Sequence, residues 1–185
     1  MNTHYLAPLF TPESVALYGA SDRIDSVGGV VFENLLTSGF EGRIYAINPK
    51  RDEVQGQKAY SSLDEIDESI DLAVVATPAK SIPGIVEACG ERGIKMMLIL
   101  SAGFRETGAE GRRLEDRVTQ LVNRYGIRLM GPNCLGIIRP DKGLNITFGN
   151  NNAAPGNLAF VSQSGAICTA ILDWAEKNEI GFPGR

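Results

Sequence analysis

The sequence predicts an α/β fold of the Rossmann-like, doubly wound type, in which helices cover both faces of a parallel sheet. Short apolar runs alternate along the chain with stretches that carry apolar residues at helical spacing. Each apolar run ends at a glycine, proline or asparagine, or leads into one, and these residue types favour turns. Right-handed crossovers bring the carboxyl ends of all such strands to one edge, where sheets of this kind bind ligands.

Five apolar runs are long enough for a buried strand and too short for a helix. The first run stops at Gly19, and the second is stopped by Pro49. The five expected strands lie within residues 14–21, 43–48, 71–76, 95–100 and 127–130.

Between these runs the apolar residues recur every three or four positions, which is typical of amphipathic helices. The first such helix is closed by Gly39, and the last one is strongly charged on its outer face. We expect helices over residues 27–38, 81–92 and 110–125, and a hairpin or irregular excursion over 53–60.

The end of the sequence predicts the beginning of a second domain. A polar stretch rich in turn formers, residues 149–156, indicates a connection. It is followed by a predicted strand, 157–161, and a predicted helix, 165–177. One strand and one helix bury too little apolar surface to fold alone. We therefore expect a first domain over 1–150, a linker over 151–156, and a truncated second domain over 157–185.

Composition excludes several functional classes. The net charge of −4 disfavours nucleic acid as a partner, because the phosphate backbone requires a basic surface. We expect neither a signal peptide nor a membrane partner, since the first residues lack a charged, apolar leader and no apolar run spans a bilayer. The scattered Cys89, Cys134 and Cys168 suit a reduced, cytoplasmic protein without a metal site. The single histidine, His4, lies in a polar leader, so no catalytic residue is assigned.

The loop after the first strand combines small residues with a predicted helix start. Gly19 and Ser21 allow close approach of a ligand, Arg23 adds a positive charge, and the helix N-terminus favours an anion. The spacing does not fit the G-x-G-x-x-G fingerprint, and an ordinary tight turn is the alternative.

The loop after the second strand has the sequence Asn48-Pro49-Lys50, followed by Arg51. Nicotinamide-binding folds place an acidic residue here to bind the adenosine ribose. Cations in its place suit a ribose that carries a phosphate, as in NADP or coenzyme A. The alternative is that both cations are plain surface charges.

Three further loops are expected at the same edge, and a fourth belongs to the second domain. We expect Cys134 to be core filler or to lie near an acyl or thiol group, without nucleophilic activity. The second-domain loop is expected to bind an anion at a helix start, to cap that helix, or both. The residues of these loops are Thr77-Pro78-Ala79, Ser101-Ala102-Gly103, Asn133-Cys134 and Ser162-Gln163-Ser164-Gly165.

Taken together, the loops resemble the alpha-subunit-like portion of NDP-forming acyl-CoA synthetases, the group that includes succinyl-CoA synthetase. The matching strings occur in family order over almost the whole chain, and the last two are the most specific. They are Ser14-Val-Ala-Leu-Tyr-Gly-Ala-Ser21, Gly42-Arg-Ile-Tyr-Ala-Ile-Asn-Pro-Lys50, Asp71-Leu-Ala-Val-Val-Ala-Thr-Pro78, Ser101-Ala-Gly-Phe104, Gly131-Pro-Asn-Cys-Leu-Gly136 and Ala159-Phe-Val-Ser-Gln-Ser-Gly-Ala166.

This resemblance implies a coenzyme A-binding domain followed by the first βα unit of a flavodoxin-like ligase domain. It implies that Asn133 and Cys134 lie towards the thiol end of the ligand. The turn Ser162–Gly165 would belong to the phosphate site that serves a phosphohistidine. The implied coenzyme A ligands are Gly19, Ser21, Arg23, Val27, Asn48, Pro49, Lys50, Thr77, Pro78, Ala79, Ser101 and Ala102.

The family's phosphorylated histidine and its ATP-grasp segments have no counterpart in these residues. We therefore expect the chain to bind coenzyme A or acyl-CoA without catalysing ligation. It would work with the remaining ligase domains, or with a beta-subunit-like ATP-grasp partner, in an ADP-forming acyl-CoA synthetase. The alternatives are the acyl-CoA-sensing region of a protein lysine acetyltransferase, an NAD(P)-binding sensor or oxidoreductase domain, and a free-standing coenzyme A-binding protein.

Overall fold

The predicted strands join into one sheet in the computed structural model, which describes residues 4–149 and 153–183. All five expected strands are present, and the 53–60 segment forms the expected hairpin. The strands of the sheet are β1 Ser14–Tyr18, β2 Arg43–Ile47, β3 Glu53–Val54, β4 Gln57–Tyr60, β5 Leu72–Val75, β6 Met96–Ile99 and β7 Arg128–Met130.

The strand order is β3-β4-β2-β1-β5-β6-β7, and every pair except β3–β4 is parallel. β1 is therefore central, with β2 and β5 on either side of it. The chain leaves β1 in one direction along the sheet and later continues from β5 in the other. This reversal beside β1 is the topological switch point at which doubly wound sheets bind ligands.

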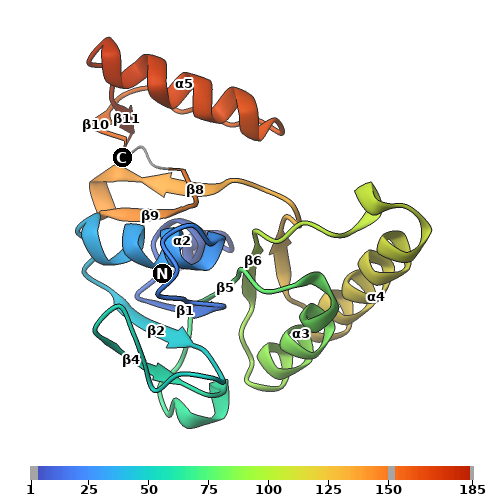
Figure 1. The fold of residues 1–185 in the computed structure, drawn as a ribbon. Coiled ribbons are helices and arrows are strands. Elements are labelled where there is room, and N and C mark those ends of the chain that lie inside the picture. The colour runs from blue at the N-terminus through green and yellow to red at the C-terminus, as the bar shows by residue number, and fades with distance from the viewer. Residues whose placement is uncertain (1–3, 150–152, 184–185) are drawn as a thin grey trace.

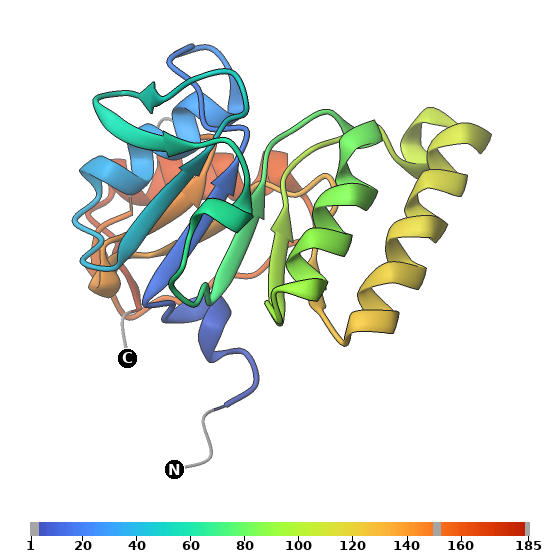
Figure 2. The same cartoon turned by 90° about the horizontal axis from the view of Figure 1, so that it is seen from below.

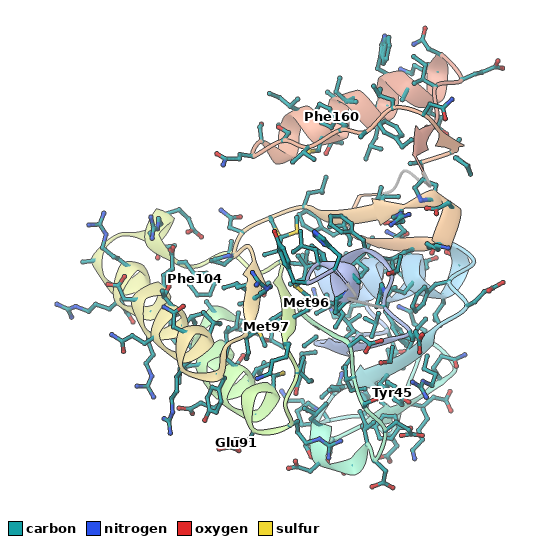
Figure 3. The ribbon with its side chains drawn as sticks, turned by 180° about the vertical axis from the view of Figure 1, so that it is seen from behind. Tyr45, Glu91, Met96, Met97, Phe104 and Phe160 are labelled. Carbon is teal, nitrogen blue, oxygen red and sulfur yellow. The ribbon has the colours of Figure 1, made fainter. Side chains whose placement is uncertain are left out.

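Both faces of the sheet are buried, which explains why the strands read as continuous apolar runs. On β1, Ala16 and Tyr18 point into one core, while Val15 and Leu17 point into the other. Figure 3 shows the same alternation on β6, where the consecutive Met96 and Met97 belong to opposite cores.

The two faces are covered by different elements. α3 and α4 pack together over one face, and α2 covers the other (Figure 2). α4 ends at Gly126, whose φ of +63° is the left-handed conformation that commonly terminates a helix. The helices of the first domain are α1 Ala7–Phe10, α2 Val27–Thr37, α3 Ile82–Glu91 and α4 Ala109–Tyr125, with short 3₁₀ turns at Leu63–Glu65, Ala79–Ser81, Arg105–Thr107 and Pro140–Lys142.

A hairpin that the sequence did not predict covers the outer side of α2 (Figure 1). It consists of β8, Gly136–Arg139, and β9, Leu144–Thr147, which pair antiparallel. Its apolar side chains join the α2 core, and the Asn34 side chain of α2 donates to Thr147 O at 2.8 Å. α2 is thus enclosed between the sheet and this hairpin.

Beyond residue 152 the prediction is partly wrong. α5, Gly165–Lys177, has the predicted bounds, but residues 157–161 form no strand. A strand is stabilised by pairing with neighbours, and the only backbone hydrogen bond between this segment and another described part of the chain is from Leu158 N to Gly181 O, at 3.2 Å. Its apolar side chains are exposed instead, Val161 to 96%, and Figure 3 shows Phe160 beside α5, away from the two cores.

The predicted linker, residues 151–156, is described only from residue 153 onwards. Within it, Pro155–Gly156 forms β10, a two-residue strand that pairs in parallel with β11, Phe182–Pro183. α5 lies on the outer side of the β8–β9 hairpin (Figure 1).

The described residues contain no helix that has both the length and the apolar character needed to cross a bilayer. They also contain no group of three or more histidine, cysteine or acidic side chains arranged to hold a metal ion.

Candidate functional site

A cavity of about 960 Å³ opens at the carboxyl edge of the sheet, beside the switch point. We call it the carboxyl-edge pocket. The loops that follow β1, β2, β5 and β6 converge on it, as the sequence predicted. Ten of the predicted site residues line it: Gly19, Ser21, Arg23, Val27, Asn48, Pro49, Lys50, Thr77, Pro78 and Ser101.

The loop after β1 depends on two glycines. Gly19 has a φ of +90°, and a Cβ added to it would lie 2.8 Å from Ala76 O. A Cβ on Gly28 would lie only 1.9 Å from Gly19 O, because α2 begins directly against the end of β1. Both positions therefore require glycine, and this close packing directs the start of α2 at the pocket.

The first turn of α2 provides free hydrogen-bond donors. Ser26 caps the helix, and its side chain accepts from Gly29 N at 3.1 Å. Within the described part of the chain, the backbone amides of Val27 and Gly28 donate to no acceptor. Both residues line the pocket, so their amides and the positive end of the helix dipole are available to an anion.

Asn48 occupies the place where nicotinamide-binding folds carry a carboxylate. Its side-chain amide donates to Ala20 O at 2.9 Å, and its side-chain oxygen accepts from Lys50 N at 2.9 Å. One side chain therefore connects the loops after β1 and β2. The sequence showed that no carboxylate follows β2, and the structure shows that Asn48 at this position forms hydrogen bonds to both loops instead.

Among the described residues that line the pocket, the charged ones are all basic. They are Arg23 and Lys50, and no acidic residue lines the cavity. Arg23 forms an exposed ion pair with Asp25 at 3.4 Å, and its hydrogen bond lowers the pKa of that carboxyl. Lys50 enters no ion pair with a described residue. The wall thus favours an anionic ligand.

The loops after β5 and β6 are tied together by hydroxyl groups. Ser101 Oγ donates to Thr77 O at 2.6 Å, and Ser81 Oγ lies 2.9 Å from Thr77 Oγ1. All three residues line the pocket. This side of the pocket is consequently a fixed wall of short side chains rather than a flexible loop.

Nine lining residues are not among the predicted ligands, although three of them, Ala20, Ser26 and Gly28, belong to the predicted loop after β1. Several are strand ends or helix residues, whose contribution depends on how the elements pack rather than on a loop pattern. They are Tyr18, Ala20, Ser26, Gly28, Ile47, Ser61, Ala76, Ser81 and Ile85.

Tyr18 is the largest of these residues, and its hydroxyl oxygen lies 3.7 Å from the Cys89 thiol sulfur of α3. Burial raises the pKa of the Cys89 thiol to about 11 and that of Tyr18 well above its usual range. Both groups therefore stay neutral at physiological pH, so this pair adds no charge beside the pocket.

Four predicted residues do not line the pocket: Ala79, Ala102, Asn133 and Cys134. Asn133 remains close, because its backbone amide donates to Ser101 O at 3.0 Å. The Cys134 thiol donates to Ile99 O at 3.4 Å and packs against the core on the α2 side. Burial raises its pKa to about 11, so the unreactive form predominates near neutral pH.

The predicted second-domain loop lies at the N-terminus of α5. Ser164 caps the helix by accepting from Ile167 N at 3.4 Å, and Ser164 N donates to Ser162 Oγ at 3.1 Å. The capping interpretation is therefore correct. A Cβ added to Gly165 would lie 4.0 Å from Leu135 Cβ, so this turn adjoins the segment that follows Cys134.

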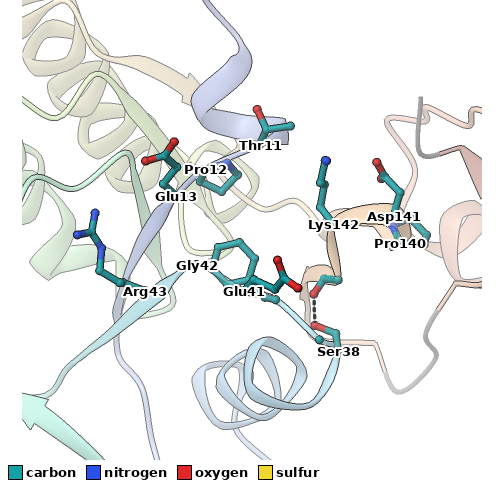
Figure 4. A pocket seen from close by; sticks show the side chains of 13 residues that line it. Thr11, Pro12, Glu13, Ser38, Glu41, Gly42, Arg43, Pro140, Asp141 and Lys142 are labelled. Carbon is teal, nitrogen blue, oxygen red and sulfur yellow. Dashed lines mark hydrogen bonds between the residues drawn. The ribbon is translucent and has the colours of Figure 1, made fainter.

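A second cavity, of about 820 Å³, lies at the amino edge of the sheet (Figure 4). We call it the amino-edge pocket. Its wall carries both signs of charge: Arg43 and Lys142 on opposite sides, and acidic groups on Glu13, Glu41 and Asp141. This mixture does not favour a polyanion.

Two relatives of the chain are larger proteins that bear a ligase name. It is 42% identical over 174 residues to an ADP-forming acetate–CoA ligase I of Archaeoglobus fulgidus, a match that spans 94% of this chain and 25% of the relative. It is 41% identical over 181 residues to the alpha subunit of an ADP-forming acetate–CoA ligase I of Pyrococcus furiosus, covering 96% of the chain and 39% of the relative.

A solved structure shares the fold. The dinucleotide-forming acetyl-coenzyme A synthetase 1 of Candidatus Korarchaeum cryptofilum, in complex with phosphate and ADP, superposes with a TM-score of 0.90 at 36% identity. The superposition covers 98% of this chain and 38% of that protein. The chain thus spans between a quarter and two fifths of the length of these relatives.

Two families match successive parts of the chain. Residues 155–184 match the succinyl-CoA ligase like flavodoxin domain. Residues 13–140, which contain the whole sheet and every lining residue of the carboxyl-edge pocket, match the CoA binding domain. The chain therefore belongs to the family of CoA binding domains.

Proposed function

We propose that coenzyme A binds in the carboxyl-edge pocket. The observation that carries this proposal is the combination of two cations, no acidic lining residue and two free helix amides at one end of a family-typical sheet. Coenzyme A carries a diphosphate and a 3′-phosphate on an adenosine, joined to a long pantetheine arm. A cavity that carries one cation in the β1 loop and one in the β2 loop, with mostly small or apolar residues elsewhere, suits both parts.

Each part of the pocket then has a role. Lys50 and Arg23 neutralise phosphate charge, and the amides of Val27 and Gly28 donate to phosphate oxygens. The wall that includes Thr77, together with Ser101, flanks the pantetheine arm. The thiol end of that arm then extends towards the segment that contains Asn133 and Cys134.

We infer further that the chain is the first part of an ADP-forming acyl-CoA synthetase. The relatives from Archaeoglobus fulgidus and Pyrococcus furiosus are acetate–CoA ligases by name, which favours this interpretation over a lysine acetyltransferase. Ligation then requires the remaining domains or a beta-subunit-like ATP-grasp partner, and Ser162–Gly165 contributes to a phosphate site in the second domain. Free thiols at all three cysteines are consistent with a cytoplasmic location.

The test is calorimetric titration of the chain with coenzyme A, acetyl-CoA, NAD and NADP. Saturable binding of the two coenzyme A ligands alone is expected, because Asn48 offers no carboxylate to the ribose of NAD, and because residues 13–140 match a CoA binding domain, which favours coenzyme A over NADP. A preference for NAD or NADP would overturn the proposal. Binding of none of the four would refute a complete coenzyme A site within these residues.

A further inference from the structure

The tip of the β3–β4 hairpin reaches across to the loop that follows β1. The Gln55 side-chain amide donates to Ser21 O and to Gly29 O, both at 2.9 Å. Its backbone amide donates to Asp22 Oδ1 at 2.7 Å. These acceptors precede Gln55 by 26 to 34 residues, and the carbonyl groups lie on either side of the segment that leads into α2.

The conformation of Gln55 is unusual for its residue type. Its φ is +47°, followed by +73° at Gly56, which is the pattern of a two-residue turn with both central residues left-handed. Such turns favour asparagine or glycine at the first position. Turn geometry alone therefore does not account for glutamine, whereas the reach of its longer side chain to two carbonyl groups does.

Gln55 is not among the residues that line the carboxyl-edge pocket. Its effect is on the loop that does line the pocket. Together with the bond from Asn48 to Ala20 O, it engages carbonyl groups at both ends of the loop. The free amides of Val27 and Gly28 lie in the chain between the engaged carbonyl groups of Ser21 and Gly29.

We propose that Gln55 is a positioning residue for coenzyme A: it holds residues 21–29 in the ligand-binding conformation before the ligand arrives. This inference rests on the proposed function. If the loop is already ordered in the free protein, the binding free energy is not reduced by the entropy cost of ordering it. If the loop instead samples other conformations, the apparent affinity falls in proportion to the fraction of competent molecules.

The test compares Gln55→Asn with Gln57→Asn in the free chain and with coenzyme A. Asparagine keeps the turn preference at position 55, but its side chain is one methylene shorter and loses the two carbonyl bonds. Gln57 lies on the same hairpin with its side chain exposed, so it provides the matched control. Binding is measured by calorimetry, loop order by amide hydrogen exchange, and folding by the thermal midpoint.

We expect Gln55→Asn to bind coenzyme A roughly tenfold more weakly than wild type, because fewer molecules have a competent loop. Amide exchange over residues 21–29 should accelerate in the free variant and slow again at saturating coenzyme A. The thermal midpoint and the exchange of the remaining chain should match those of Gln57→Asn.

Two results would overturn this role. One is unchanged coenzyme A affinity in Gln55→Asn, and the other is faster exchange over the whole chain, which indicates a purely structural effect. If wild type itself fails to bind coenzyme A, the proposed function is wrong. In that case unchanged exchange over residues 21–29 in the variant would overturn the loop-holding role as well.

Discussion

The carboxyl-edge and amino-edge pockets have similar volumes, about 960 and 820 Å³, but they lie at opposite edges of the same sheet. α2 extends between them. Its first residues line the carboxyl-edge pocket, and the Ser38–Gly39 segment that follows its last residue lines the amino-edge pocket. A helix carries a partial positive charge at its N-terminus and a partial negative charge at its C-terminus. One helix therefore gives the two pockets opposite polarity.

The side chains reinforce this difference. The carboxyl-edge pocket has cations without acids, whereas the amino-edge pocket has three acidic residues beside two basic ones. Because the two cavities have similar volumes, they differ mainly in the charge of their lining residues and of the helix end that each one meets. The ligand preference of each edge of this sheet therefore depends on the direction of α2 as well as on the shape of the cavity.

The largest effect is expected from Gly28→Ala. The added Cβ would lie 1.9 Å from Gly19 O, where only backbone movement can relieve the clash. We expect the free energy of unfolding to fall by about 3 kcal/mol, as for overpacked sites, with coenzyme A affinity reduced more than about tenfold. Urea unfolding and calorimetry measure the two losses.

Two glycine variants serve as controls for this change. Gly143→Ala brings a Cβ to 2.3 Å from the Gly39 carbonyl carbon at the amino-edge pocket, so it should destabilise the fold without changing the coenzyme A affinity of folded molecules. Gly84→Ala meets nothing within 4 Å on α3 and should stabilise the chain by up to about 1 kcal/mol. Loss of coenzyme A binding in Gly143→Ala would contradict the functional separation of the two edges.

High pH should weaken the fold beneath the carboxyl-edge pocket. The pKa of Cys89 is raised from 9.0 to about 11, so the unfolded chain loses this proton first as the pH rises. Stability is therefore lost between pH 9 and 11, by roughly 2 to 3 kcal/mol from this thiol. Wild type and Cys89→Ala are compared by urea unfolding across this range.

Cys89→Ala should lack this loss of unfolding free energy between pH 9 and 11, whatever its stability at neutral pH. Cys168→Ala, on α5, removes a thiol outside both cores and should keep the slope of wild type. Parallel slopes for wild type and Cys89→Ala would show that burial of this thiol does not link folding to pH.

The smallest of these effects concerns single surface cations. Lys50→Ala should weaken coenzyme A binding by about tenfold, or about 1.4 kcal/mol, and dephospho-coenzyme A binding much less, if Lys50 contacts the 3′-phosphate. Lys142→Ala removes an exposed cation from the amino-edge pocket and should change neither affinity. Calorimetric titration of both variants with both ligands checks this.

Equal losses for the two ligands in Lys50→Ala would reject its role at the 3′-phosphate. A loss in Lys142→Ala as large as that in Lys50→Ala would instead remove the distinction between the two pockets.

Local pattern predicted most of the first domain. The five strands and three of its helices follow from apolar spacing and from turn residues such as Gly39 and Pro49. The same pattern failed at residues 157–161, where an apolar run has no partner strand among the described residues. It also missed the β8–β9 hairpin, because two four-residue strands become stable only by packing on α2.

The site divides in the same way. Residues in loops directly after strands were predicted, because the carboxyl ends of parallel strands must share an edge. Tyr18 and Ile85 were missed, since strand ends and helix faces enter the pocket only through tertiary packing. Cys134 was expected to be core filler or to lie near the thiol end of the ligand, and the structure places its thiol against the α2-side core.

The sequence by itself determined the fold class, the edge of the sheet at which a ligand binds and the positive charge of its second loop. These depend on periodicity, turn chemistry and residue type, which are local properties. The tertiary structure decided that Asn48 and Gln55 hold the loop after β1, and that α2 gives the two pockets opposite polarity. These depend on contacts between distant residues and on the direction of a helix, which arise only when the chain is folded.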